Sequence, residues 1–240
     1  MEKYLLFLCL TACVYSATGN KAPFITKCNG EDSKCITAAA QTAIPILAAG
    51  IAELGVETMD PLNIASVNAS SSNLQLLVKD VVVTGTKNCQ AAKVERDVKN
   101  SKLFVNLLCD ATMKGQYDMK GKLLFLPIEG KGDMRVILRK ILIHAEVDLE
   151  EKVGKDSKNH WNIKKWKHEF ELKDKSEVEF DNLFNGNELL AKTVKDLIAE
   201  NGNEIILDIG PEIIKAVVAK VAKNCNHFFR AVPLEELVLS

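Results

Sequence analysis

The stretch "DMRVILRKILIHAEVDLEEKV", Asp133 to Val153, alternates apolar and polar residues but changes phase midway. Side chains of a β-strand point alternately to two faces, so a change of phase indicates an extra residue in the strand, a β-bulge, here near Arg139-Lys140. Long bulged strands bend strongly, and the stretch therefore predicts a sheet that curls. Its apolar residues take even positions and then odd ones: Met134, Val136 and Leu138, followed by Ile141, Ile143, Ala145, Val147 and Leu149.

The stretch "HWNIKKWKHEFELK", His160 to Lys173, changes phase in the same way and predicts a second bulge near Lys164-Lys165. The period of two extends from about Leu74 to Leu183, with turns that contain Gly, Asn or Lys. We therefore expect an antiparallel meander. Its strands are expected at 73–85, 90–98, 102–121, 122–128, 133–153 and 160–173.

The expected strand 122–128 is unusual because Leu123 to Leu126 form an unbroken apolar row before Pro127. Such a row fits a strand buried on both faces between a helix and a folded-back layer of the sheet. An ordinary strand covered on both faces explains the row equally well. Pro127 fits an edge or a bulge, and the glycines at 121, 130 and 132 allow sharp bends.

Helical periodicity flanks the meander on both sides. Between Cys35 and Leu54 the apolar residues fall on one helical face, with a kink expected at Pro45. From Leu189 to Phe228 the period is again 3.6, with interruptions at Gly202 and at Gly210-Pro211. A helix this long needs a cover, which the concave face of the curled sheet can supply. The sequence thus predicts an α+β fold in which a long C-terminal helix is wrapped by a strongly curved antiparallel β-sheet.

Composition and the N-terminus limit the class of protein. The 240 residues are 47% hydrophobic, and 31 Lys+Arg nearly balance 32 Asp+Glu, so nothing indicates a nucleic-acid partner. Residues 1–16 have the layout of a secretory signal peptide, with cleavage after Ala17 as the alternative. We expect residues 17–240 to form a single domain that is secreted and monomeric and does not insert stably into membranes.

Five of the seven cysteines follow the expected signal peptide. A disulfide between Cys28 and Cys35 would tie the N-terminal arm to the first helix, whose start Asp32 or Ser33 can cap. A three-residue hairpin loop centred on Lys99 would place two further cysteines directly opposite each other, within disulfide range. Zinc binding competes with this interpretation, but no CxxC or nearby His supports it. The second expected pair is Cys89 with Cys109, and Cys225 is left as a free thiol.

Chemical motifs give no support for catalysis. The sequence has no GxSxG, HExxH, P-loop or helix-opening GxGxxG pattern, and its four histidines have no ligand spacing. His144 and His168 lie on strands that could be neighbours, which favours structural hydrogen bonds over catalysis. We expect no enzyme activity, no cofactor and no metal. Asn68-Ala69-Ser70 is an N-glycosylation sequon in a polar stretch, and an unoccupied sequon is the alternative.

Several motifs together resemble those of a known family. "CNGEDSKC" (28–35), "LGVETMDPLNI" (54–64) and "KGQYDMKGKLLFLPIEGKGDM" (114–134) stand in the order typical of the insect takeout and juvenile-hormone-binding-protein family. "NLFNGNELL" (182–190) and the terminal "VPLEEL" (232–237) continue that order, and the chain resembles takeout proteins more closely than haemolymph hormone carriers. The first cysteine pair matches the family, whereas Cys89 and Cys109 do not belong to its pattern. The resemblance implies a fold related to the bactericidal/permeability-increasing protein and an internal apolar tunnel for a terpenoid or acyl-like ligand.

We therefore expect a secreted carrier, found in haemolymph or another extracellular fluid, for a small hydrophobic ligand. The alternative is an interaction or defence protein of the same fold that recognises lipid surfaces; the near-neutral charge argues against it. An apolar chain needs few polar contacts, so the candidate lining is drawn from apolar residues of the two helical regions and the doubly apolar strand. These are Ile44, Leu47, Ile51, Met59, Leu62, Leu124, Leu126, Phe184, Val194, Ile198, Ile205 and Ile209.

Overall fold

The structure is a computed structural model that describes residues 21–239. The expected signal peptide at 1–16 and its cleavage site lie outside the described residues. The helices are α1 (Ser33–Ala49), α2 (Glu188–Glu200), α3 (Gly202–Ile209), α4 (Pro211–Ala231) and α5 (Leu234–Leu237), with short 3-10 turns η1 (Ala52–Leu54), η2 (Thr86–Asn88) and η3 (Phe184–Gly186). The strands are β1 (Leu62–Asn68), β2 (Leu74–Thr84), β3 (Gln90–Asp97), β4 (Lys102–Leu123), β5 (Leu126–Val153), β6 (Asn159–Leu172) and β7 (Glu177–Phe180).

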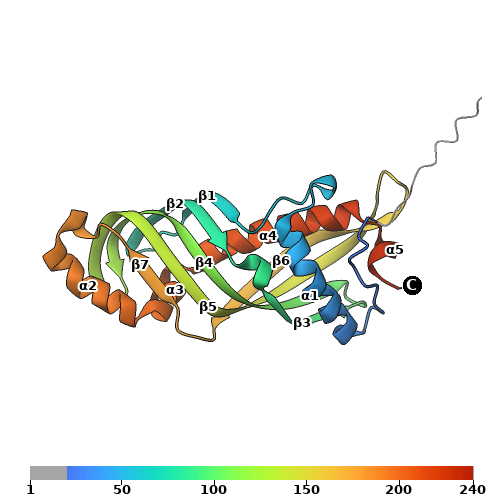
Figure 1. Ribbon diagram of the computed structural model, residues 1–240, viewed down its shortest axis with the longest axis horizontal. Helices are drawn as coiled ribbons and strands as arrows, with labels where there is room; N and C mark the ends of the chain where they lie inside the picture. The colour runs from blue at the N-terminus through green and yellow to red at the C-terminus, as the bar shows by residue number, and fades with distance from the viewer. Residues whose placement is uncertain (1–20, 240) are drawn as a thin grey trace, which may run out of the picture.

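The strands form one antiparallel sheet in the order β1-β2-β4-β5-β6. β3 pairs with the first part of β4, beyond the end of β2, and β7 pairs with β5. Helix α4 packs against both β1 and β6, the strands at opposite ends of this order. One helix can touch both only where the sheet curls around it, and Figure 1 shows α4 running lengthwise behind the bent strands. The predicted α+β architecture is confirmed.

Both predicted bulges are present. The β4–β5 ladder changes register between Cys109 and Ala111, where Arg139 and Lys140 stand opposite Asp110. The Asp110 carboxylate accepts a hydrogen bond from the Lys140 backbone N–H at 2.8 Å, which satisfies one group freed by the bulge. In the β5–β6 ladder the register changes between Asp148 and Leu149, opposite the extra residue Lys164. A third bulge, at Asp80 and Val81 of β2, was not predicted.

The curl also brings β3 and β6 together. The Arg96 guanidinium of β3 lies 4.8 Å from the ring centre of Trp161 of β6, although β4 and β5 separate these strands in the sheet. Phe229 of α4 meets the same indole edge-on, with ring centres 5.5 Å apart. Burial lowers the pKa of Arg96, with Glu151 acting in the opposite direction. This group of side chains links the sheet's far strands to the wrapped helix.

The prediction of a separate strand at 122–128 was wrong. Leu123 pairs with Leu126, and Leu124 and Phe125 form the two-residue turn between β4 and β5. Leu124 has a φ of 54°, the left-handed geometry that such tight turns require. Both turn side chains are exposed, Phe125 by 71%. The apolar row is therefore a hairpin tip, and neither explanation based on two covered faces applies.

The glycines after this turn lie inside β5 instead of separating strands. A Cβ on Gly132 would stand 2.7 Å from the Asp181 carbonyl oxygen, and one on Gly130 would stand 3.1 Å from the Leu183 Cα. The segment that leaves β7 crosses the sheet at this point, and Gly130 forms a β-bridge with Leu183. Glycine within a strand can mark a site where another backbone approaches closely, and Gly130 and Gly132 serve this purpose.

The predicted C-terminal helix of some forty residues is three helices. The chain breaks at Asn201 and at Gly210-Pro211, beside or at the interruptions seen in the sequence. Only α4 is wrapped by the sheet; α2 and α3 pack against β7 at one end of the molecule (Figure 1). The expected N-terminal helix likewise ends at Ala49, with Pro45 inside it, and η1 follows separately.

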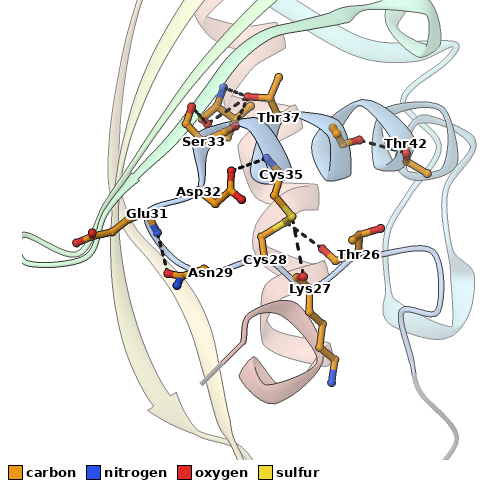
Figure 2. Close-up of a disulfide and its surroundings, with 12 residues drawn as sticks. Thr26, Lys27, Cys28, Asn29, Glu31, Asp32, Ser33, Cys35, Thr37 and Thr42 are labelled. Carbon is orange, nitrogen blue, oxygen red and sulfur yellow. Dashed lines mark hydrogen bonds between the residues drawn. A yellow bond between two sulfur atoms is a disulfide. The ribbon is translucent and has the colours of Figure 1, made fainter.

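The described cysteines pair as predicted. Cys28 and Cys35 form a disulfide at the start of α1, and Figure 2 shows the Asp32 carboxylate accepting the Cys35 backbone N–H beside it, at 3.0 Å. Cys89 and Cys109 form the second disulfide, with Cα atoms 4.3 Å apart, and Cys225 is free. Most of the buried apolar residues of sheet and helices form one hydrophobic cluster. No helix within residues 21–239 is both long and apolar enough to cross a bilayer.

Candidate ligand-binding site

The covered face of β4 is occupied by residues at odd positions. At its far end these side chains are buried, as Cys109, Met113 and Tyr117 are. Nearer its start, Leu103 and Leu107 face the same side and pack against the core, yet both stay partly accessible. Inward apolar groups that remain partly accessible are candidates for contact with an apolar ligand.

Three successive rows across β4, β5 and β6 continue this surface. Leu107 lies opposite Ile143, which lies opposite Phe170; the next rows are Val105–Ala145–His168 and Leu103–Val147–Trp166. Apart from Val147, all members of these rows are partly buried. Val217, Val218 and Val221 of α4, and Ile44 and Leu47 of α1, are partly buried against the same core. We call the following set the inner apolar surface: Ile44, Leu47, Leu103, Leu107, Ile143, Ile163, Trp166, Phe170, Leu172, Val217, Val218 and Val221.

Helix α1 is fixed beside this surface by a polar stripe with helical spacing. Thr37 exchanges hydrogen bonds with Val94 of β3, donating to its carbonyl at 3.3 Å and accepting its N–H at 2.9 Å. One turn earlier Ser33 donates to the same carbonyl at 3.0 Å, and one turn later Gln41 accepts the Ala91 N–H at 2.7 Å. The side chains of this stripe form hydrogen bonds with backbone groups at the free edge of β3, and Figure 2 shows Ser33 and Thr37. Ile44 and Leu47 of the same helix pack against the core.

The predicted lining residues are not brought together as one surface. Ile44, Leu47, Ile51, Phe184 and Ile209 are partly buried and packed against the core. A second group is fully buried, and Leu124 lies in the exposed hairpin turn, with Leu126 beside it partly buried. The fully buried group consists of Met59, Leu62, Val194, Ile198 and Ile205.

Most of the inner apolar surface, namely its residues from β4, β5, β6 and α4, was not predicted from the sequence. The sequence did contain a pattern that could have identified these residues. The odd positions of 103–107 share the strand face of Cys109, and the alternation that follows each bulge places Ile143 and Phe170 on the same face. Val217, Val218 and Val221 follow the helical spacing of α4. Core residues and ligand-contacting residues look alike in a sequence, so the pattern alone does not separate them.

Charged and polar chemistry is sparse at this surface. Among the described residues, no three His, Cys, Asp or Glu side chains are placed to hold a metal ion. His144 faces outward, within 3.0 Å of Asn106 and of Glu171, as expected of a structural histidine. Cys225 follows Val218 and Val221 along α4, and burial raises the pKa of its thiol to about 11. Burial also raises the pKa of the Tyr117 hydroxyl, to about 12, and this group donates to the Asp181 carbonyl.

Two hollows lie on the outer side of the sheet, away from all of the predicted lining. One, of about 410 Å3, is centred on the bulge at Arg139 and Lys140. The other, of about 420 Å3, lies over Lys114 and Arg135 and is rimmed by several carboxylates. Arg139 pairs with Glu177, and Lys140 with Asp174 at 3.2 Å, so the charges of the first hollow neutralise each other. Charged side chains contribute to the lining of both hollows, in contrast to the inner apolar surface.

Comparisons with known proteins agree with this architecture. The family model described as haemolymph juvenile hormone binding protein matches residues 5–239. Two curated relatives are circadian clock-controlled proteins named daywake. The protein from Drosophila yakuba is 24% identical, and the match covers 87% of this chain and 81% of that protein. The protein from Drosophila melanogaster is also 24% identical, and the match covers 88% of this chain and 86% of that protein. The crystal structure of Epiphyas postvittana Takeout 1 superposes with a TM-score of 0.87 at 35% identity, covering 90% of this chain and all of that one.

Proposed function

The chain belongs to the haemolymph juvenile hormone binding protein family, and from that premise we propose that it is a secreted carrier for a small hydrophobic molecule. The cargo lies between α4 and the curled sheet, on the inner apolar surface. A terpenoid or a fatty-acyl chain has the right chemistry. The protein works as a monomer, needs no cofactor and catalyses no reaction.

One observation supports this proposal most strongly: inward apolar side chains of β4, β5, β6, α1 and α4 pack against the core yet remain partly accessible. Exposed apolar area inside a protein is unfavourable unless a ligand covers it. A ligand that buries roughly 300 Å2 of apolar surface would gain on the order of 7 kcal/mol, before the cost of ordering it. Affinity can therefore arise from burial alone.

Secretion is supported by the two disulfides, which persist in oxidising compartments, and by the haemolymph proteins that define the family. The expected signal peptide at 1–16 would direct the chain there. In an extracellular fluid the carrier would keep its cargo out of water and release it at a target.

Extraction of the native cargo tests the proposal directly. Protein purified from insect tissue without detergent should yield, on solvent extraction and mass spectrometry, one dominant hydrophobic compound near equimolar amount. Leu107→Trp, which fills the inner apolar surface, should lose this compound. Val153→Trp is the matched control because Val153 is 72% exposed at a hairpin end. An empty wild-type protein, or equal cargo in both variants, would contradict the carrier function.

The alternative, recognition of a lipid surface, has one observation in its favour. Leu124 and Phe125 form an exposed apolar hairpin tip, and the Leu124 N–H lies 3.5 Å from the Asp208 carboxylate, next to exposed Leu207. Protruding apolar tips of this kind can enter a bilayer. If this is the main function, wild-type protein should float with phosphatidylcholine vesicles and the double variant Leu124→Ser, Phe125→Ser should not. Retention of cargo by that double variant would separate the two functions.

A further inference from the structure

His168 points toward the inner apolar surface. Along β6, residues 165–172 alternate without interruption between exposed and partly buried positions, and His168 takes a partly buried one. Trp166 and Phe170, two residues before and after it, share its side of the strand and pack against the core. The bulge at Lys164 sets this phase; without the extra residue, His168 would face solvent.

The row that contains His168 is the one with the smallest side chains. Its neighbours across the sheet are Ala145 and, beyond it, Val105. The row on one side consists of Leu107, Ile143 and Phe170, and the row on the other side consists of Leu103, Val147 and Trp166. The residues that flank the imidazole in its own row are therefore smaller than most of those in the adjacent rows. The Trp166 ring lies beside the imidazole, and the centres of the Trp166 and His168 rings are 5.7 Å apart.

The imidazole has no hydrogen-bond or ion-pair partner among residues 21–239. The buried Asn224 amide, in contrast, accepts the Glu57 N–H at 2.8 Å and donates to the Lys220 carbonyl. Glu212 and Lys215 of α4 are the charged groups that act on His168, and they pair with each other at 3.2 Å. A polar ring that folding leaves unpaired on an apolar wall is free to bind a polar atom of a ligand.

Burial, followed by the nearby Lys215 charge, lowers the pKa of His168 below its ordinary value. The ring is therefore neutral at physiological pH, with one nitrogen that donates and one that accepts. A neutral donor suits an uncharged oxygen such as an ester carbonyl or an epoxide.

We propose that His168 binds the polar end of the cargo, which is an apolar chain that carries an uncharged oxygen acceptor. This inference rests on the carrier function proposed above and adds specificity to it. The chain lies along the inner apolar surface, and its oxygen is placed in the row of Val105 and Ala145. His168 thus distinguishes an oxygenated ligand from a plain hydrocarbon of the same length.

Two probes of matched length test the inference: methyl dodecanoate, which has the acceptor, and tetradecane, which lacks it. Their affinities would be measured by displacement of a fluorescent fatty-acyl probe from wild type, His168→Phe and His168→Gln. Wild type should prefer the ester by about fivefold, the worth of one neutral hydrogen bond. His168→Phe should lose this preference while binding tetradecane as wild type does, and His168→Gln, which keeps a donor, should retain part of it.

His144→Phe is the control because His144 lies on the neighbouring strand but faces outward; its preference should equal that of wild type. An ester preference that survives in His168→Phe would overturn the role of His168. A wild-type protein that binds both probes equally would overturn it as well while leaving the carrier function intact. Failure of wild type to bind either probe would remove the carrier function and this inference together.

Discussion

Cys89 and Cys109 face each other because the β3–β4 ladder shifts by one residue just before it reaches them. The structure has a four-residue connection at 98–101 instead of the three-residue loop expected from the sequence. With the four-residue connection alone, the two cysteines would be out of register by one position. A bulge at Ala92, between Ala91 and Lys93, restores the pairing. The expected disulfide is therefore present for a reason different from the one that predicted it.

The first prediction concerns this disulfide. Replacing both cysteines, Cys89→Ser with Cys109→Ser, should lower the free energy of unfolding by about 2–5 kcal/mol, because the unfolded chain is no longer cross-linked. Guanidinium unfolding followed by circular dichroism would measure the loss. Peptide mapping without reduction should recover the 89–109 and 28–35 pairs. Recovery of Cys225 bridged to Cys89 or Cys109 would contradict the assignment.

The second prediction concerns Gly132. Gly132→Ala should cost more than about 2 kcal/mol of stability, because its Cβ would stand 2.7 Å from the Asp181 carbonyl oxygen, a backbone atom that cannot move aside cheaply. Lys131→Ala, at the exposed neighbouring position, should change stability by less than about 0.5 kcal/mol. Equal melting temperatures for the two variants would show that β5 and the 181–183 segment do not approach so closely.

The third prediction concerns the Cys225 thiol. Since burial raises its pKa to about 11, almost no reactive thiolate exists at pH 8 in the folded protein. Ellman's reagent should label it slowly in the native state and rapidly in guanidinium. Labelling should accelerate as the pH rises toward 11, since that deprotonates the thiol. A hydrophobic ligand should slow it further because Cys225 follows Val218 and Val221 along α4. Fast native labelling at pH 8 would contradict this placement.

The fourth prediction concerns glycosylation. Asn68 ends β1 with an exposed side chain whose oxygen accepts the Ser70 N–H at 3.1 Å, so the sequon is presented at the surface. Protein expressed in insect cells should shift to higher mobility after peptide-N-glycosidase treatment. Asn68→Gln should already run at the shifted position. Unchanged mobility of the treated wild type would show that the sequon is unoccupied.

Alternation and its phase carried the prediction of the fold. The two slips in β5 and β6 predicted bulges that the ladders contain, and the curl followed from them. The hairpin tip was missed because Leu124 and Phe125 are not turn residues such as Asn-Gly, although Leu124 adopts the geometry of one. β1 and β7 were missed because short strands lack enough alternating positions to be recognised.

The candidate site was harder to predict than the fold. Ile198 and Ile205, predicted to line the cavity because they stand on an apolar helical face, are fully buried on α2 and α3, which pack against β7, and their role in binding stays a prediction. The interruptions at Gly202 and Gly210-Pro211 marked where the C-terminal helices separate, but the sequence could not show that only α4 enters the sheet. His168 was assigned a structural hydrogen bond because its facing direction depends on the Lys164 bulge and its partners on tertiary packing.

The most direct test of the carrier account uses the two tryptophans, both on β6. Trp166 belongs to the inner apolar surface, whereas Trp161 is 7% exposed and packs against Arg96 and Phe229. Variants with one indole each, Trp161→Phe and Trp166→Phe, would be titrated with a brominated fatty acid methyl ester, whose bromine quenches tryptophan only on contact. The account predicts saturable quenching of Trp166 at one ligand per protein and much weaker quenching of Trp161. Absence of saturable quenching at Trp166, in a protein that binds the ester, would contradict the placement of cargo between α4 and the curled sheet.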